Sequence, residues 1–521
     1  MQVLRELALI VNNNRLKNVE LLDATAKEKS RTEVFYQGLL DNRFLTDEDA
    51  AQFFYGEDKA HPAYQKLRHK LKRKLINHLF FLNSKEPSHS NRYQAFYECY
   101  RDWAAAKILF GKNASGAGVN LSFNILKRAK KYEFTELTVD VARTLRVHFG
   151  TLEGNLKKFE QYNDLFKEYT EIIGWEDLAE ELYTELVIRY ANIKATDDLI
   201  QKKAKEYYDR LQEGLDKYQT YRLHLCATLI KLTQYSSVNN YSETAKICQE
   251  SIEFFERKNY LASMPLQIFY YQLLVCHIQL KQYEEGRIAA ESCLEVLTEG
   301  SFNWFKYQEL YLMLLMHTHQ YQKAYQLFHK VNDHKRFAFL PENVKEMWKI
   351  FEAYIHYLVI IQKVKLSKKD KHFTKFRLGR FLNGTPIYSK DKRGMNIPIL
   401  VVQILFMILQ RNYNSAIDRI EAIEKYCSRY LTKDDTFRSN CFIKMLLQIP
   451  ACSFHKAAVE RKTAKFLNRL KGMPLDVAKQ SHEIEIIPYE ELWELVIDSL
   501  ENKFYRKQPQ RAGSTARKVH A

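Results

Sequence analysis

Glycine and proline are scarce in this chain, which has 16 glycines and 10 prolines among 521 residues. Average proteins contain about 7% glycine and about 5% proline. β-Sandwiches and barrels need many special turns, and dinucleotide-binding folds need glycine at their phosphate loops, so both classes are disfavoured. With 46% hydrophobic and 27% charged residues, the chain is neither collagen-like nor wholly disordered. The composition therefore predicts an all-α protein.

Cysteine is infrequent too, and long hydrophobic runs are missing from the sequence. The eight cysteines are scattered without a CxxC pair, which predicts reduced, buried thiols rather than a disulfide scaffold. The most hydrophobic run, 397–409, is shorter than the ~20 residues that span a bilayer. The first eleven residues contain an early Arg5–Glu6 pair and lack a signal-peptide pattern. These features predict a cytoplasmic protein without a transmembrane segment.

The positive charge of the chain is concentrated in three short segments. The formal net charge is +17, yet residues 59–85 hold eight Lys/Arg and no acid, and residues 362–393 hold eleven Lys/Arg and two acids. Residues 503–521 add six Lys/Arg and no acid, so the remainder of the chain is mildly acidic. Localised basic charge is typical of a protein that binds a polyanion, although basic loops can also serve solubility alone.

Hydrophobic periodicity and breaks divide the chain into five segments. We expect an N-terminal helical piece at 1–90, helical repeats at 91–361 and an irregular basic insertion at 362–395. Further helical repeats are expected at 396–503, followed by a disordered basic tail at 504–521.

A short pattern recurs between pairs of predicted helices. Each copy has a polar residue, then Tyr, two further residues and a small one. Helices joined so closely must pack antiparallel, and the small residue lets them approach. The copies are Lys131–Thr135, Gln282–Gly286, Gln320–Ala324 and Asn412–Ala416, with a looser one at Asn240–Thr244.

These hairpins resemble the tetratricopeptide-repeat superfamily in a degenerate form. The residues near the signature positions of that family are Leu273, Leu274, Tyr283, Gly286 and Ala290, and then Tyr321, Ala324 and Phe328. The usual Trp and the closing proline of each repeat are missing. The resemblance implies a right-handed superhelix of antiparallel hairpins whose concave face binds proteins or peptides.

The N-terminal piece contains two predicted helices. Thr46 and Gly56 suit the caps of a short helix, and Pro62 suits the start of a basic helix at 62–82. On that helix the leucines share one face with Tyr64, and the opposite face presents a cationic stripe of Lys66, Lys70, Arg73 and Lys74.

This pair of helices faintly resembles a helix-turn-helix, which implies nucleic-acid binding through the basic helix. It looks more loosely like bacterial activators that place a winged DNA-binding domain before a tetratricopeptide-like one. No wing hairpin is recognisable after Leu82. The alternative is a first hairpin of the repeat array with a solvated basic face.

The basic insertion offers a second set of candidate polyanion-binding residues. Its aromatic residues, Phe373, Phe376, Phe381 and Tyr388, could stack on bases or could pin the segment to the helices. The candidate cations are Lys368, Lys369, Lys371, Lys375, Arg377 and Arg380.

No catalytic, metal-binding or cofactor-binding motif is recognisable. The glycine-rich stretch 111–118 lacks the GK[ST] ending of a phosphate loop, and no HExxH is present. Glu176, Asp177, Glu180 and Glu181 are expected to form a solvated helical face. We therefore expect a non-enzymatic scaffold that binds proteins or peptides. The alternative is a nucleic-acid-binding regulator that uses 62–82 and 362–393, and a third hypothesis is an adaptor for a membrane surface or an acidic protein.

Overall fold

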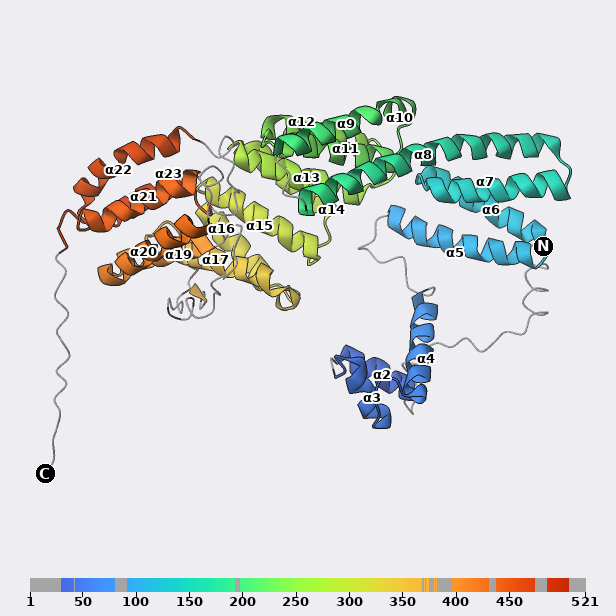
Figure 1. The fold of residues 1–521 in the computed structure, drawn as a ribbon, viewed down its shortest axis with the longest axis horizontal. Coiled ribbons are helices and arrows are strands. Elements are labelled where there is room, and N and C mark those ends of the chain that lie inside the picture. Colours follow the sequence, from blue (N-terminus) through green and yellow to red (C-terminus); the bar gives the residue numbers. More distant parts are fainter. Residues whose placement is uncertain are drawn as a thin grey trace. The chain divides into compact units, whose positions relative to one another are not determined.

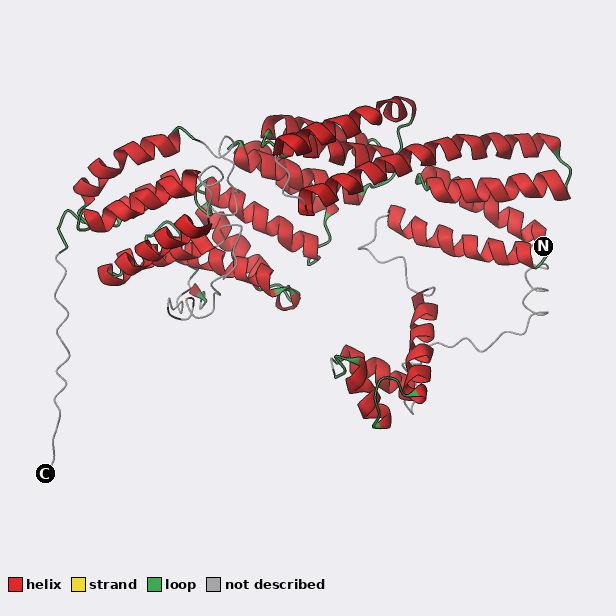
Figure 2. Ribbon diagram, viewed as in Figure 1, coloured by secondary structure: helices red, strands yellow, loops and turns green. Residues whose placement is uncertain are grey.

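The computed structural model describes residues 30–41, 43–79, 91–192, 197–367, 370, 372–373, 379, 381, 396–430, 437–473 and 485–505. This part of the chain is built from helices and connecting loops, and no strand occurs within it (Figure 2). Successive helices lie side by side, as α5 with α6 and α6 with α7 (Figure 1). The predicted all-α fold with packed neighbouring helices is confirmed for these residues. None of the described helices is both long enough and apolar enough to cross a membrane.

The helices follow one another along the chain with short connections. A five-residue π-helix (η1) and a three-residue 3₁₀-helix (η2) interrupt the α-helices. In chain order the elements are α2 (Arg31–Leu40), α3 (Asp47–Tyr55), α4 (Pro62–Leu79), α5 (Asn91–Gly111), α6 (Ser115–Lys131), α7 (Thr135–Val147), η1 (His148–Leu152), α8 (Leu156–Asn192), α9 (Asp197–Arg210), α10 (Gln212–Lys217), α11 (Tyr221–Ser236), α12 (Tyr241–Glu256), α13 (Ser263–Gln279), α14 (Tyr283–Val296), α15 (Phe302–His317), α16 (Tyr321–Asn332), η2 (Phe337–Phe339), α17 (Glu342–Ile360), α19 (Asn396–Leu409), α20 (Tyr413–Tyr430), α21 (Phe437–Ala451), α22 (Lys456–Lys471) and α23 (Tyr489–Asp498).

The described residues divide between two compact units. The first draws on Met1–Leu178, Gly214–Leu223 and Lys258–Ala262. The second draws on Ala179–Glu213, His224–Arg257 and Ser263–Ala521. The five segments expected from the sequence stay a prediction.

Helices α2, α3 and α4 pack into a small three-helix module in the first unit. The caps of α3 are as predicted: Thr46 accepts a hydrogen bond from the backbone N–H of Asp49, and Gly56 ends the helix at φ +66°. Helix α4 begins at Pro62, and its apolar face packs into a common core. The buried residues of that core are Phe35, Phe44, Ala50, Ala51, Tyr64, Leu67 and Leu71.

One turn geometry joins the two helices of most hairpins. The first helix ends, a non-glycine residue takes a positive φ, and the second helix begins two positions later. The N–H of the residue between them donates to a carbonyl five positions back, over 2.8–3.0 Å, which is the long bond of a Schellman motif. The residues with positive φ are Asn113, Glu133, Asn239, Lys281, His319 and Arg411. Only one residue therefore separates the residue of positive φ from the start of the next helix. A connection this short forces the two helices into a tight hairpin.

The predicted tyrosine marks the start of the second helix in four hairpins. Tyr241, Tyr283, Tyr321 and Tyr413 are the first residues of α12, α14, α16 and α20. The small residue three positions later is buried in all four, at Thr244, Gly286, Ala324 and Ala416. A Cβ on Gly286 would lie 3.2 Å from His277 Cβ on α13, so a side chain there would crowd the first helix of the same hairpin. The close approach predicted from these small residues is confirmed.

The copy at Lys131–Thr135 is out of register with the others. Tyr132 lies at the C-terminal cap of α6, and the positive φ follows it at Glu133. The residue that corresponds to Tyr283 is therefore Thr135, the first residue of α7, and the small buried residue is Thr138. The prediction aligned this copy by its tyrosine, which was wrong by three positions.

The cysteines contribute to the packed interior. The seven whose side chains the structure describes carry free thiols and are buried. They are Cys99, Cys226, Cys248, Cys276, Cys293, Cys441 and Cys452. The predicted role of these residues as buried small hydrophobes is confirmed.

Candidate functional site

The cationic stripe of α4 lies on the outer face of the three-helix module. Lys66, Lys70 and Arg73 are exposed and Lys74 is half-buried. Leu67 and Leu71, which alternate with them along the chain, are buried in the module core. The helix holds six Lys/Arg and no acid. The structure therefore brings the four predicted α4 cations onto one helix surface.

The charges of α3 lie close to α4 and have the opposite sign. Asp47 accepts a hydrogen bond from Tyr64 over 2.6 Å and pairs with Arg68 Nε at 3.1 Å. Glu48 pairs with Lys59 at 2.6 Å. These contacts hold the start of α4 against α3 and leave the stripe residues further along the helix exposed.

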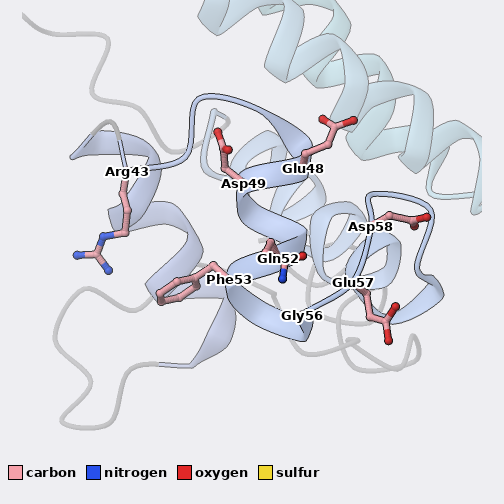
Figure 3. A pocket seen from close by; sticks show the side chains of 8 residues that line it. All are labelled: Arg43, Glu48, Asp49, Gln52, Phe53, Gly56, Glu57 and Asp58. Carbon is pink, nitrogen blue, oxygen red and sulfur yellow. The ribbon is translucent and has the colours of Figure 1, made fainter.

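A shallow acidic pocket lies at α3 and the loop after it (Figure 3). Its carboxylates point in different directions, and most of them already accept hydrogen bonds or form ion pairs. Asp49 accepts from the N–H of Thr46, and Asp58 accepts from the N–H of Ala60. Within the described residues no group of three His, Cys, Asp or Glu is placed to hold a metal ion.

The second set of predicted cations falls on residues that the structure does not describe. Lys368, Lys369, Lys371, Lys375, Arg377 and Arg380 all lie outside the described residues. Two aromatic residues of the same insertion are described, and both are buried. Phe373 lies 5.4 Å from the Phe328 ring and 5.6 Å from the Tyr325 ring, measured between centroids. Phe373 therefore pins the insertion to the helices and does not present its ring for stacking on bases.

Asp370 holds the same insertion to α16. It accepts hydrogen bonds from Tyr325 Oη over 2.6 Å and from His329 Nε2 over 2.9 Å. The backbone N–H groups of His372 and Phe373 also donate to this carboxylate.

A buried arginine organises the C-terminal part of the second unit. Arg438, on α21, is fully buried and makes a two-pronged ion pair with Glu485, with N–O distances of 2.7 and 2.9 Å. Its guanidinium also donates to Glu490 and, over 2.8 Å, to the carbonyl of Met473. Glu490 in turn pairs with Lys281 at 2.8 Å. This network fastens the start of α23 to α21 and to the turn between α13 and α14.

A pocket of about 520 Å³ lies beside this network. We call it the turn pocket, because it is formed by the α13–α14 and α15–α16 turns together with α23. Its lining residues are Lys281, Tyr283, Glu284, Arg287, Tyr311, Leu314, Leu315, His317, Thr318, His319, Gln320, Lys323 and Glu491.

Glu491 is the chemically unusual group of the turn pocket. Its side chain is 22% exposed, its Oε2 atom is buried without a hydrogen-bond partner, and a carboxylate oxygen lies 3.5 Å from His319 Nε2. Burial, and then the charge of Glu490, raise the pKa of Glu491 to about 7. The neighbouring Glu490 behaves in the opposite way, since Arg438 and Lys281 outweigh burial and lower its pKa to about 2. Two adjacent carboxylates thus ionise in very different pH ranges.

The predicted acidic face at Glu176 is partly wrong. Asp177, Glu180 and Glu181 are exposed, but Glu176 is buried and accepts hydrogen bonds from Thr135 Oγ1 at 3.0 Å and Thr220 Oγ1 at 2.7 Å. Glu176 therefore holds the 214–223 segment against α7 within the first unit.

Replacing Arg438 with methionine should destabilise the second unit by about 3–5 kcal/mol, because Glu485 would remain buried without its counter-charge and Glu490 would keep only Lys281. Denaturant unfolding followed by circular dichroism measures this loss. Lys456→Met is the matched control, since Lys456 pairs with the exposed Asp498 of α23 at 3.1 Å. The control should cost no more than about 1 kcal/mol. Equal losses in both variants would contradict the structural role of Arg438.

Glu491→Gln should stabilise the protein in a pH-dependent way. The folded chain binds a proton at Glu491 more tightly than the unfolded chain, so wild-type stability falls as pH rises from about 4.5 to about 7. The glutamine variant lacks this loss and should gain up to about 3 kcal/mol relative to wild type at pH 8, and little at pH 4.5. Thermal unfolding at the two pH values measures the difference, and an equal effect at both would contradict the raised pKa.

Comparisons with known proteins identify no relative of this chain. No protein-family model, no curated protein and no solved structure matches it. The candidate functions therefore rest on the hairpins, on the charges of α4 and on the turn pocket.

Proposed function

We propose that the chain is a non-enzymatic, tetratricopeptide-like scaffold of the cytoplasm that binds protein or peptide partners. In this proposal the hairpins form a right-handed superhelix. The observation that carries the proposal is the repeated hairpin connection, with a positive φ two residues before each second helix. Arrays of near-identical hairpins build extended binding surfaces, because each unit adds a similar stretch of helix and turn.

The turn pocket is the best candidate docking point on this scaffold. It combines aliphatic and aromatic walls with a few charged groups, as peptide-binding sites do. Leu314 and Leu315 supply the buried apolar floor, and Tyr283 and Tyr311 are half-buried beside them. The concave face implied by the family resemblance is the other surface on which a partner would extend.

Random peptides displayed on phage and selected against the full chain test the scaffold proposal. We expect enriched peptides whose affinity falls at least tenfold, or ~1.4 kcal/mol, when Lys323→Trp narrows the turn pocket. Gln326→Trp is the control, because Gln326 is exposed on the same helix and does not line the pocket. Failure to enrich any peptide, or equal binding by both variants, would contradict docking at this pocket.

A second candidate function is nucleic-acid binding through α4, as a transcription-type regulator. It is favoured by one observation: the apolar face of α4 is packed in the module core, and its cationic face is exposed. A cationic stripe on a packed helix suits a phosphate backbone or a groove. The module then resembles a helix-turn-helix in which α4 would lie against the nucleic acid.

Fluorescence anisotropy with labelled random duplex and single-stranded DNA and RNA tests this second function across a salt series. If four α4 cations contact phosphates, log affinity should fall linearly with log salt, with a slope of about −0.9 per duplex contact. Reversal of Lys66, Lys70, Arg73 and Lys74 to Glu should then abolish binding.

The control for this experiment makes the same charge change on another basic helix. It reverses Arg461, Lys462, Lys465 and Arg469, which are exposed on α22. Binding that survives the α4 reversal, or that falls equally in both variants, would show attraction by net charge alone. Absence of binding at low salt would exclude the function.

A further inference from the structure

Glu491, which lines the turn pocket, has a buried carboxylate oxygen with no hydrogen-bond partner among the described residues. This atom is Glu491 Oε2, and it lies at the edge of α23 that lines the pocket. Leaving a carboxylate oxygen buried and unpaired costs free energy, so a hydrogen-bond donor that reached it would be bound favourably. The pocket therefore has an unfilled acceptor.

Two of the three Lys and Arg residues that line the same pocket already form ion pairs. Lys281 pairs with Glu490 at 2.8 Å, and Arg287 pairs with Glu284 at 3.0 Å and with Glu291 at 2.7 Å. Lys323 is exposed to solvent. At Lys281 and Arg287 an anionic ligand would have to compete with carboxylates already in place, whereas at Glu491 a cationic ligand would meet an acceptor that is unused.

The walls of the pocket suit a long cationic side chain. Leu314 and Leu315 are buried along the floor, and Tyr283 and Tyr311 offer aromatic faces. Arginine and lysine place an aliphatic stem against such surfaces and carry the charge at the tip. A guanidinium can also stack on an aromatic ring while it donates to a carboxylate.

We propose that the turn pocket receives an arginine or lysine side chain of a partner segment, with the Glu491 carboxylate as the acceptor of its charged tip. This inference rests on the proposed scaffold function and names the chemistry of the partner. The partner segment carries a basic residue flanked by residues small enough to let that side chain enter between the two turns.

Binding of a cation should depend on pH, because it requires the ionised carboxylate of Glu491. The charged and titratable groups that face Glu491 influence that ionisation. On or just before α23 these are Glu485, Glu490 and Glu494. From the α13–α14 turn they are Lys281 and Tyr283, and from the α15–α16 turn they are His319 and Tyr321.

A cation binds the ionised carboxylate, and near pH 7 a part of the Glu491 population is protonated. Affinity should therefore rise by roughly tenfold between pH 6 and pH 8, with release of a proton from Glu491 on binding at pH 6. Arginine keeps its charge throughout this range, so the ligand does not titrate.

Titration calorimetry of the full chain with short capped peptides tests the inference. The probes are acetyl-Ala-Arg-Ala-amide and its Lys, Gln and Glu analogues, at pH 6 and pH 8. We expect the Arg and Lys peptides to bind more tightly than the Gln peptide, and we expect Glu491→Gln to weaken the Arg peptide by at least tenfold at pH 8. Asp498→Asn is the matched control, because Asp498 lies on the same helix with a side chain that is 75% exposed and does not line the pocket. The control should stay within about twofold of wild type.

Four results would overturn the inference. The first is equal binding of the Arg and Gln peptides, the second is preferred binding of the Glu peptide, and the third is no loss in Glu491→Gln. Absence of binding by every probe would also overturn it. The scaffold function has a separate outcome, because peptides selected by phage display would still bind and would lose affinity in Lys323→Trp whatever their charge.

Discussion

A buried guanidinium is the constraint on which the C-terminal part of the second unit depends. Arg438 is fully buried, and Glu485 and Glu490 provide its counter-charge. Glu485 precedes α23 and Glu490 lies in its first turn, so their attraction to Arg438 fixes where that helix begins. The next residue, Glu491, is thereby placed at the turn pocket, and the negative charge of Glu490 beside it helps to keep its pKa high. The ion-pair network thus explains the position of the pocket carboxylate, whose raised pKa results first from burial and then from the charge of Glu490.

The other side of the pocket follows from the repeated turn. In these hairpins the second helix begins after only three or four connecting residues, so the turns of neighbouring hairpins present similar groups at similar positions. Lys281 and His319 hold the same place in their turns, each with positive φ. This explains how so many turns occur in a chain with few glycines. Ordinary residues adopt the left-handed conformation here, and the hydrogen bonds and packing of the hairpin offset a strain of order 1 kcal/mol at each position.

The features that were correctly predicted from the sequence depend on residues that lie close together in the chain. The caps at Thr46 and Gly56, the start of α4 at Pro62 and the buried small residue of four hairpins all follow from short-range spacing, and all are confirmed. The register error at Tyr132 arose because a tyrosine can precede the turn as easily as follow it. Glu176 was misassigned because its partners, Thr135 and Thr220, lie more than 40 residues away in the chain. Arg438 and Glu491 were missed for the same reason, since Glu485 lies 47 residues after Arg438 and nothing in local periodicity marks the pair.

In the turn pocket Glu491 Oε2 is an acceptor without a hydrogen-bond partner among the described residues, and the proposed cationic side chain would supply that partner. The most direct measurement is the titration of its side-chain carboxyl carbon by ¹³C NMR, with Glu491→Gln to assign the signal, in the presence and absence of the Arg peptide. We expect a midpoint near pH 7 in the unliganded protein and a clear fall in that midpoint when the peptide is bound. A midpoint near the ordinary glutamate value that the peptide leaves unchanged would contradict this role of Glu491.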